Sequence, residues 1–490
     1  MKRFVIMGLA CMMVVSLSAQ IDTDWSQRVR ESRQNAREEY ERFRQQAEQD
    51  YNDFRTKANE EYARFMAEPW SAFETQPAEE IPKLPKPPVP VLANPNEHPK
   101  PLTIPVENKP VSPIPIVHPQ PIEPISPAIQ PDSPETIIRF YGTVVIFHFP
   151  EGNSLHMKDA SESSVSKLWK QLSTPVYDNM IAECLQNRDK LNLCDWGYVM
   201  MTKQVAESFF GSYTNEAVVL HMYLLTQSGY QMRIGRADDR LCVLVGSDAK
   251  IYRFRFFRIN NIKYYCFDNS IDCKSLHVFN HAFPKEKLMC LNMTQPKLDV
   301  KKTEPKTHAS KRYSMAKADV VLNQNLIDFY NDCPVNSEWQ LYSKASLSNQ
   351  AKESLYPVLH KAIEGKTQVQ AANILLNFVQ TGFAYATDQE QFGHERPLYP
   401  DESLYYPYCD CEDRSILFAC LVRELLGLDV VLLDYPEHIS TAVCFTEDVE
   451  GDYLMLGNKK YVACDPTYNG ADIGMSMPSM KKYSPIVVLF

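Results

Sequence analysis

Three residues near the end of the 490-residue chain have side chains that together could carry out nucleophilic catalysis. Cys411 lies in DCEDRSILFAC, His438 in YPEHISTAV and Asp465 in ACDPTY. A cysteine thiolate is a nucleophile, an imidazole can take up the thiol proton, and a carboxylate can orient and stabilise the charged imidazole. These residue types are suited to a cysteine nucleophile that a histidine and a carboxylate activate.

The segment 410–433 is predicted to form a helix followed by a strand, with Asp410 as the N-cap. Cys411 then lies in the first turn, where the positive end of the helix dipole favours a thiolate. The neighbouring carboxylates of Glu412 and Asp413 oppose the thiolate by like-charge repulsion. An imidazolium partner is therefore needed to stabilise it.

His438 is expected to begin a strand after a proline-containing turn, and Asp465 is expected to follow a second strand. The intervals from Cys411 to His438 and from His438 to Asp465 are both 27 residues. Each interval has room for one helix–strand unit or one hairpin. The three side chains can therefore meet at one end of a sheet.

These features together resemble the transglutaminase-like superfamily, which has a papain-like fold. The resemblance rests on Cys-x-Asp at a helix start, L-x-x-x-L-x-R-x-x-x-G along the helix, histidine at a strand start and D-P-T, and it covers about residues 350–490. It implies an α+β domain in which a helix packs on an antiparallel sheet. It also implies that Cys411 is the nucleophile, His438 the base and then the acid, and Asp465 the orienting group.

The function expected from this resemblance is that of a cysteine-dependent hydrolase, such as a cysteine protease, or an acyltransferase. Its substrates would be peptides, proteins or the peptides of peptidoglycan. Hydrolysis and transfer to an amine share the thioester and are not separated by the sequence. The alternative is a non-catalytic envelope binding or assembly protein with a vestigial site.

Several nearby residues leave alternatives open. Cys409 and Ser440 stand where the family often has glycine and an aromatic residue, which puts the substrate preference in doubt. Cys409 is also a competing nucleophile, although the helix pattern favours Cys411. Gln391 is a candidate oxyanion donor, and His394 fits a loop residue better than the base. A lone C-x-C is a weak zinc signal, so no metal or other cofactor is expected.

The chain begins with features of a secretory signal peptide over residues 1–19, namely a basic pair, an apolar run and a small-residue exit. The protein is therefore expected to be exported to the periplasm, the cell envelope or the extracellular space. Lipidation at Cys11 stays open. The remaining chain has no apolar run long enough to span a membrane. The net charge of the whole chain, −10, argues against nucleic acid as a partner.

Composition divides the rest of the chain. Residues 20–75 carry an 11-residue repeat with a Tyr/Phe stripe, which predicts a long amphipathic helix. The stripe would dock on the body, self-associate as a coiled coil or dock on a partner. Residues 76–134 hold 19 of the 34 prolines of the chain and are predicted to be an extended linker that separates rather than packs. Residues 135–297 are predicted to form an α+β domain, 298–312 a linker and 313–490 the catalytic domain.

The middle domain is also a candidate for a degenerate copy of the catalytic fold. The helix–strand pattern that begins at Asn215 parallels the one that begins at Cys411. If the two domains are related, the same strand order and connectivity should occur in both. Asn215 would then replace the nucleophile, and the copy would be inert. Two unrelated domains that share one helix–strand unit are the alternative.

Overall fold

The computed structural model describes residues 32–46, 49–50, 52–82, 89–94, 101–106, 110–112, 118–122, 125, 134–150, 155–268, 270 and 274–490. The predicted signal peptide, 1–19, and Cys11 lie outside the described residues. Within the described part of the chain, every helix is too short or too polar to cross a lipid bilayer. The protein is a mixed α+β structure with antiparallel sheets.

The C-terminal part contains a five-stranded antiparallel sheet and the helix that begins at Cys411. Its strands are β11 (Asp429–Tyr435), β12 (His438–Cys444), β13 (Tyr453–Leu456), β14 (Lys459–Cys464) and β15 (Ile486–Val488), in the spatial order β13-β14-β12-β11-β15. Helix α12 spans Cys411–Leu426, with Asp410 as N-cap and Gly427 in the left-handed conformation at its end, as the sequence predicted.

Alternation along the strands gives this sheet two apolar faces. Leu432 and Ile439 share a core with Leu417 and Leu421 of α12, whereas Val431 and its neighbours belong to a second core on the opposite face. The other elements of this part are β9 (Lys306–Ala309), β10 (Lys317–Val320), α6 (Gln324–Asp332), α7 (Trp339–Ser343), α8 (Asn349–Ile363), α9 (Gln368–Thr381), α10 (Asp388–Gln391) and α11 (Pro400–Tyr405). The predicted linker 298–312 is wrong in part, because β9 lies within it.

The proline-rich segment packs against the C-terminal sheet, so the prediction that it separates rather than packs is wrong for its described residues. Ala93 donates its backbone N–H to Asn469, Ile104 to Tyr453 and Val111 to Val487, over 2.7–2.9 Å. These donors are non-proline residues that retain an N–H between prolines. The Ile104 side chain is 5% exposed and completes the second core. The bridges at Tyr453 and Val488 cover the two edge strands, β13 and β15.

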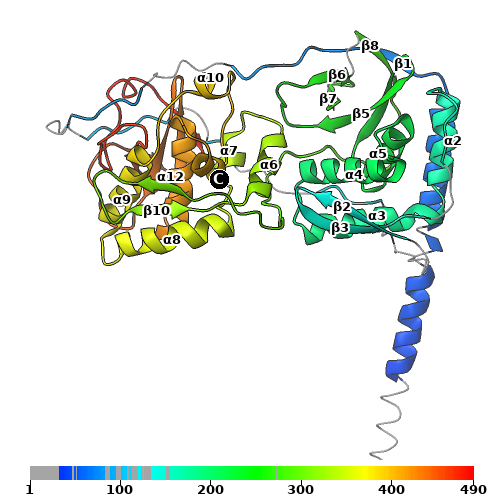
Figure 1. Cartoon of the computed structure of the whole chain (residues 1–490), viewed down its shortest axis with the longest axis horizontal. Coiled ribbons are helices and arrows are strands. Elements are labelled where there is room, and N and C mark those ends of the chain that lie inside the picture. The colour runs from blue at the N-terminus through cyan, green and yellow to red at the C-terminus, as the bar shows by residue number, and fades with distance from the viewer. Residues whose placement is uncertain are drawn as a thin grey trace, which may run out of the picture.

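The middle part contains β2 (Glu135–Phe140), β3 (Thr143–His148), α2 (Glu162–Leu172), η1 (Pro175–Tyr177), α3 (Asp178–Lys190), α4 (Asp195–Phe210), α5 (Asn215–Gln227), β4 (Met232–Ala237), β5 (Arg240–Ser247), β6 (Arg255–Ile259), β7 (Ile262–Cys266) and β8 (Ser275–Phe279). Figure 1 shows it beside the C-terminal part. Phe329 of α6 packs edge-on against Tyr141, and the apolar cores of the two parts are continuous.

The two sheets have the same topology. The middle sheet has the order β1-β8-β4-β5-β7-β6, in which β1 (Ser71–Glu74) is an addition from the N-terminal region. In both parts, five strands follow the central helix, and their spatial order is fifth, first, second, fourth, third, with antiparallel pairs throughout. A two-stranded sheet, β2-β3 or β9-β10, precedes the helices in each part. This is the outcome that a duplicated fold requires.

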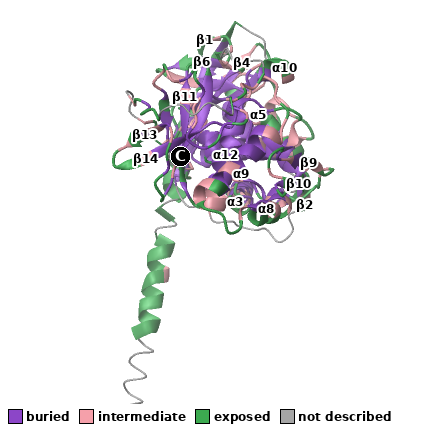
Figure 2. Ribbon diagram, turned by 90° about the vertical axis from the view of Figure 1, so that its left-hand side faces the viewer, coloured by how far each residue is buried: buried purple, intermediate pink, exposed green. Residues whose placement is uncertain are grey.

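The N-terminal helical region docks by its C-terminal portion, from Arg55 onward, where Arg55 is buried and pairs with Asp178 of α3. Tyr62 and Met66 are 3% and 0% exposed and belong to the core of the middle part, whereas Tyr40 and Phe43 are 64% and 73% exposed. Figure 2 shows the exposed portion extending from the body. The helical residues end at Met66, and the chain then forms β1, so the helix predicted over 20–75 is too long at its C-terminal end.

Candidate active site

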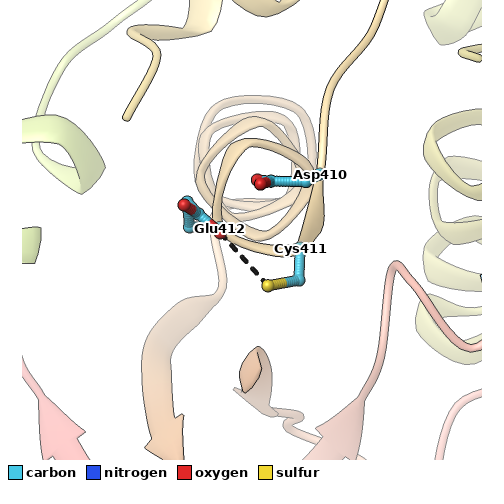
Figure 3. Close-up of side chains that lie close together, drawn as sticks. All are labelled: Asp410, Cys411 and Glu412. Atoms are coloured by element: carbon cyan, nitrogen blue, oxygen red, sulfur yellow. Dashed lines mark hydrogen bonds between the residues drawn. The ribbon is translucent and has the colours of Figure 1, made fainter. Parts of the chain in front are cut away.

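Cys411 is the first residue of α12 and is 1% exposed. Its Sγ donates a hydrogen bond to Oε2 of Glu412 over 3.1 Å. Figure 3 shows the Cys411 side chain directed outward from the first helical turn, with the Glu412 carboxylate beside it. A thiolate at Cys411 would face an ionised carboxylate at this distance, so formation of the thiolate requires Glu412 to be protonated or to move. The sequence had indicated the repulsion but not this contact.

His438 and Asp465 form a buried hydrogen-bonded pair. Nε2 of His438 donates to Oδ2 of Asp465 over 2.9 Å, and the two residues are 1% and 3% exposed. Nδ1 of His438 is buried and has no hydrogen-bond partner among the described residues. With its proton on Nε2, the neutral imidazole carries a lone pair on Nδ1. Asp465 thus fixes the tautomer that can act as a base.

The loop that follows β14 holds Asp465 in place. Oδ1 of Asp465 accepts from the backbone N–H groups of Thr467 and Tyr468 over 2.9 and 3.1 Å. From α9, Nε2 of Gln380 donates to the carbonyl oxygens of Asp465, Tyr468 and Ala471. Gln380 was not identified from the sequence, because its partners are 85 to 91 residues away along the chain.

Ser415 links the start of α12 to the start of β12. Its Oγ donates to the backbone carbonyl of Ile439 over 3.0 Å, and Ile439 directly follows His438. Ser415 lies one turn after Cys411 on the same side of the helix. The first turn of α12 therefore abuts the strand end that carries the His438–Asp465 pair.

Two of the other candidate residues have structural contacts. Both polar atoms of the Gln391 side-chain amide bind the backbone of Tyr408. Nε2 donates to its carbonyl and Oε1 accepts from its N–H, over 3.1 Å each. In this conformation the Gln391 amide anchors the segment that leads into α12. His394 lies in a loop and accepts a hydrogen bond from Arg253 over 2.7 Å.

Cys409, the competing nucleophile, differs from Cys411 in its surroundings. Its backbone N–H donates to Ala384 over 3.2 Å, and it is 1% exposed. Burial raises the pKa of Cys409 to about 12, which holds it as a neutral thiol. Nearby, Arg414 of α12 is fully buried and donates to the carbonyls of Gln380 and Phe383. Arg414 thereby ties α12 to α9 and the loop that follows it.

Carboxylates gather around the start of α12. Oxygen atoms of Asp388, Asp410 and Asp413 lie within 4.8 Å of one another, as do those of Asp388, Glu395 and Glu412. Backbone N–H groups bind several of these oxygens, for example Leu398 to Asp413 and Arg396 to Asp388. An all-oxygen set of this kind suits a hard cation such as Ca²⁺ better than zinc. The hydrogen bonds from these backbone N–H groups already stabilise part of the negative charge of the carboxylate cluster.

The middle part has three residues at the positions of the candidate triad. Asn215 begins α5 as Cys411 begins α12. In both parts a two-residue turn separates the first two strands, and Arg240 begins the second strand where His438 does. Asn215 binds the hairpin on both sides of Arg240, because its Nδ2 donates to the Asp239 carbonyl and its Oδ1 accepts from the N–H of residue 241.

Asp268 corresponds to Asp465. When the strand registers are extended, Asp465 lies opposite the third residue of β12, and Asp268 lies opposite the third residue of β5. Each carboxylate accepts from the backbone N–H two residues later, at Thr467 and at Ser270, over 2.9 Å. Arg240 also pairs with Asp268 over 3.5 Å. The middle part thus keeps the carboxylate, whereas an amide and a guanidinium stand at the positions of the candidate nucleophile and the candidate base.

Comparisons of the chain with models of protein families, with curated proteins and with solved structures find no match. The strand topology and the side-chain geometry therefore carry the functional argument.

Proposed function

We propose that residues 313–490 form a transglutaminase-like, cysteine-dependent acyl-transfer domain that acts on peptide or amide bonds. The observation that carries this proposal is the buried His438–Asp465 pair, which leaves Nδ1 of His438 without a hydrogen-bond partner among the described residues. The Ser415–Ile439 hydrogen bond joins the helix that begins at Cys411 to the strand that begins at His438. The order of helix, hairpin and carboxylate also agrees with the resemblance in the sequence. The expected signal peptide adds that the substrate lies at or beyond the cell envelope.

The chemistry assigns one role to each side chain. His438 takes the thiol proton on Nδ1, and the sulfur of Cys411 attacks the carbonyl carbon of the substrate. The C–N bond then breaks, the leaving amine takes the proton from His438, and a thioester remains on Cys411. Water or a second amine attacks the thioester, while His438 removes its proton and returns a proton to the thiolate. Asp465 keeps the imidazole oriented and stabilises its charged form.

Access to the site is part of this proposal. Cys411 and His438 are each 1% exposed, so a substrate carbonyl reaches the sulfur only after covering groups move aside. The Glu412 carboxylate must also leave the sulfur or bind a proton before the thiolate forms. The domain therefore rests in a closed state, and turnover includes an opening step.

A second candidate is a binding protein whose site no longer turns over. The burial of the triad favours it, and so does the middle part, which has the same sheet topology without a nucleophile. Incubation with peptides, proteins and peptidoglycan fragments, followed by mass spectrometry, separates the two. Products that wild-type protein forms and Cys411→Ala does not form would support the enzyme. An identical set of species in both reactions would favour the binding protein.

A further inference from the structure

The middle part contains a cavity of about 270 Å³ beside its copy of the triad. Asp268, the counterpart of Asp465, contributes to its wall, and α4, α5 and β5 supply most of the rest. The aromatic rings around it are those of Trp196, Tyr213, Phe254 and Phe267. This volume is about that of one bulky side chain with its peptide group. The rings and aliphatic side chains of the wall suit an aromatic ring, and Lys203 and Asp332 also line the cavity.

One polar group of the cavity wall has no partner. Trp196 is 4% exposed, and its indole Nε1–H is buried without a hydrogen-bond acceptor among the described residues. A buried N–H without an acceptor costs free energy, which a bound carbonyl oxygen would recover. By contrast, both ring nitrogens of His221 are occupied, by the Tyr213 hydroxyl and the Val199 carbonyl. Trp196 therefore has an unpaired donor, and because its Nε1 is itself buried, a ligand in the cavity reaches this N–H only after the indole shifts.

The cavity continues toward the C-terminal part. A second hollow of about 470 Å³ shares Phe254 and Asp332 with it and extends to Phe392 and His394. The segment 392–396 also contains Glu395, one of the carboxylates around the start of α12. An extended ligand can therefore fill the cavity with one side chain while its backbone runs along the hollow toward the candidate active site.

We propose that this cavity binds a bulky aromatic residue of a peptide, with a peptide carbonyl accepting from Trp196, so that the middle domain is a recognition site for the substrate chain. The role as a substrate site rests on the proposed function, whereas the binding itself does not require turnover. Asn215 and Arg240 replace the nucleophile and the base, so the cavity can hold a peptide without cleaving it.

The binding test uses acetyl-Gly-Gly-Phe-Gly-Gly amide, its Phe→Ala counterpart and N-acetylphenylalanine amide, titrated into full-length protein by calorimetry. Burial of the ring predicts that the Phe peptide binds about tenfold or more tightly than the Ala peptide. Met200→Trp, which fills the cavity, should abolish this preference. The same substitution at Met315, which is 56% exposed, is the matched control and should preserve it. Trp196→Phe keeps the ring, loses the donor and should bind about 2- to 10-fold more weakly.

A photo-crosslinking experiment uses the wild-type protein, so its result does not depend on whether a variant folds. The Phe residue is replaced by benzoylphenylalanine, and the crosslinked protein is mapped by mass spectrometry. Adducts within 196–203, 213–221 or 243–254 support the proposal. Equal affinities for the Phe and Ala peptides, or adducts confined to other segments, would overturn it. Weaker binding of N-acetylphenylalanine amide than of the Phe peptide would support a peptide backbone that runs along the hollow.

Cys411→Ala separates this inference from the proposed function. If Cys411→Ala binds the Phe peptide more tightly than the Ala peptide and the wild type shows no turnover, the recognition site is supported and the proposed enzymatic function is refuted. If turnover depends on Cys411 but the Phe and Ala peptides bind equally well, the enzymatic function is supported and the recognition site is refuted.

Discussion

Substitution of Tyr62 by alanine tests whether the N-terminal helical region is part of the folded body. Tyr62 is 3% exposed, and its ring lies 5.0, 4.8 and 5.1 Å from the ring centroids of Trp169, Phe279 and Phe283. Removal of a buried aromatic side chain costs about 3–5 kcal/mol, because burial is lost and a cavity remains. The free energy of unfolding of the middle part should therefore fall by that amount in Tyr62→Ala.

The repeat supplies a matched control. Tyr40 occupies the same position two repeats earlier and is 64% exposed, so Tyr40→Ala should change the free energy of unfolding by no more than about 0.5 kcal/mol. Urea unfolding followed by tryptophan fluorescence measures both. With a slope of about 3 kcal/mol per molar urea, at the upper end of the usual range, the midpoint for Tyr62→Ala should fall by roughly 1–2 M.

Tyr62→Phe separates the contribution of the ring from that of the hydroxyl. The Tyr62 hydroxyl is buried without a hydrogen-bond partner among the described residues, so Tyr62→Phe should be neutral or stabilising. Equal midpoints for Tyr62→Ala and Tyr40→Ala would refute the docking of this helix. In that case a protein that begins near residue 135 would fold as the linker prediction supposed.

Three further outcomes follow from the C-terminal part. Ile104→Ala should lower its free energy of unfolding by about 2–5 kcal/mol in urea, whereas Leu102→Ala, at a side chain 36% exposed, should have little effect. Gln380→Ala should lower turnover in the product assay more than it lowers the thermal midpoint, because the buried carbonyls around Asp465 lose their donor. Burial raises the pKa of Asp401 to about 6, above an unfolded value near 4. The folded state therefore holds a proton that the unfolded state loses, and the contribution of Asp401 to stability is fully present below about pH 4 and is lost as the pH rises through about 6. Asp401→Asn should flatten this fall in urea unfolding measured from pH 4 to 7.

Local sequence signals were sufficient for the elements that carry the site. Asp410 and Gly427 bound α12 as their capping preferences predict, and His438 begins its strand directly after the turn. Asp465 directly follows β14, as expected from the apolar run before it. Each of these features depends on residues within a few positions in the chain.

Long-range contacts could not be predicted in the same way. Tyr40 and Tyr62 have the same place in the repeat, and only the aromatic surface around Trp169 decides which of them docks. The contacts of Ile104 and Gln380 join segments far apart in the chain. Proline content predicted the extended conformation of the segment around Ile104, but not that its remaining N–H groups bind edge strands.

The rate of Cys411 alkylation by iodoacetamide, compared with that of Cys409 in the same molecule, tests the catalytic assignment most directly. Both thiols are 1% exposed and lie two residues apart, so opening of the site alone should expose them to similar extents. Peptide mapping over time at pH 7 should show Cys411 alkylated at least about tenfold faster, because His438 withdraws its proton whereas burial holds Cys409 as a neutral thiol. His438→Ala should abolish that difference. Equal rates in the wild type, or a difference that survives in His438→Ala, would contradict the assignment of Cys411 and His438 as nucleophile and base.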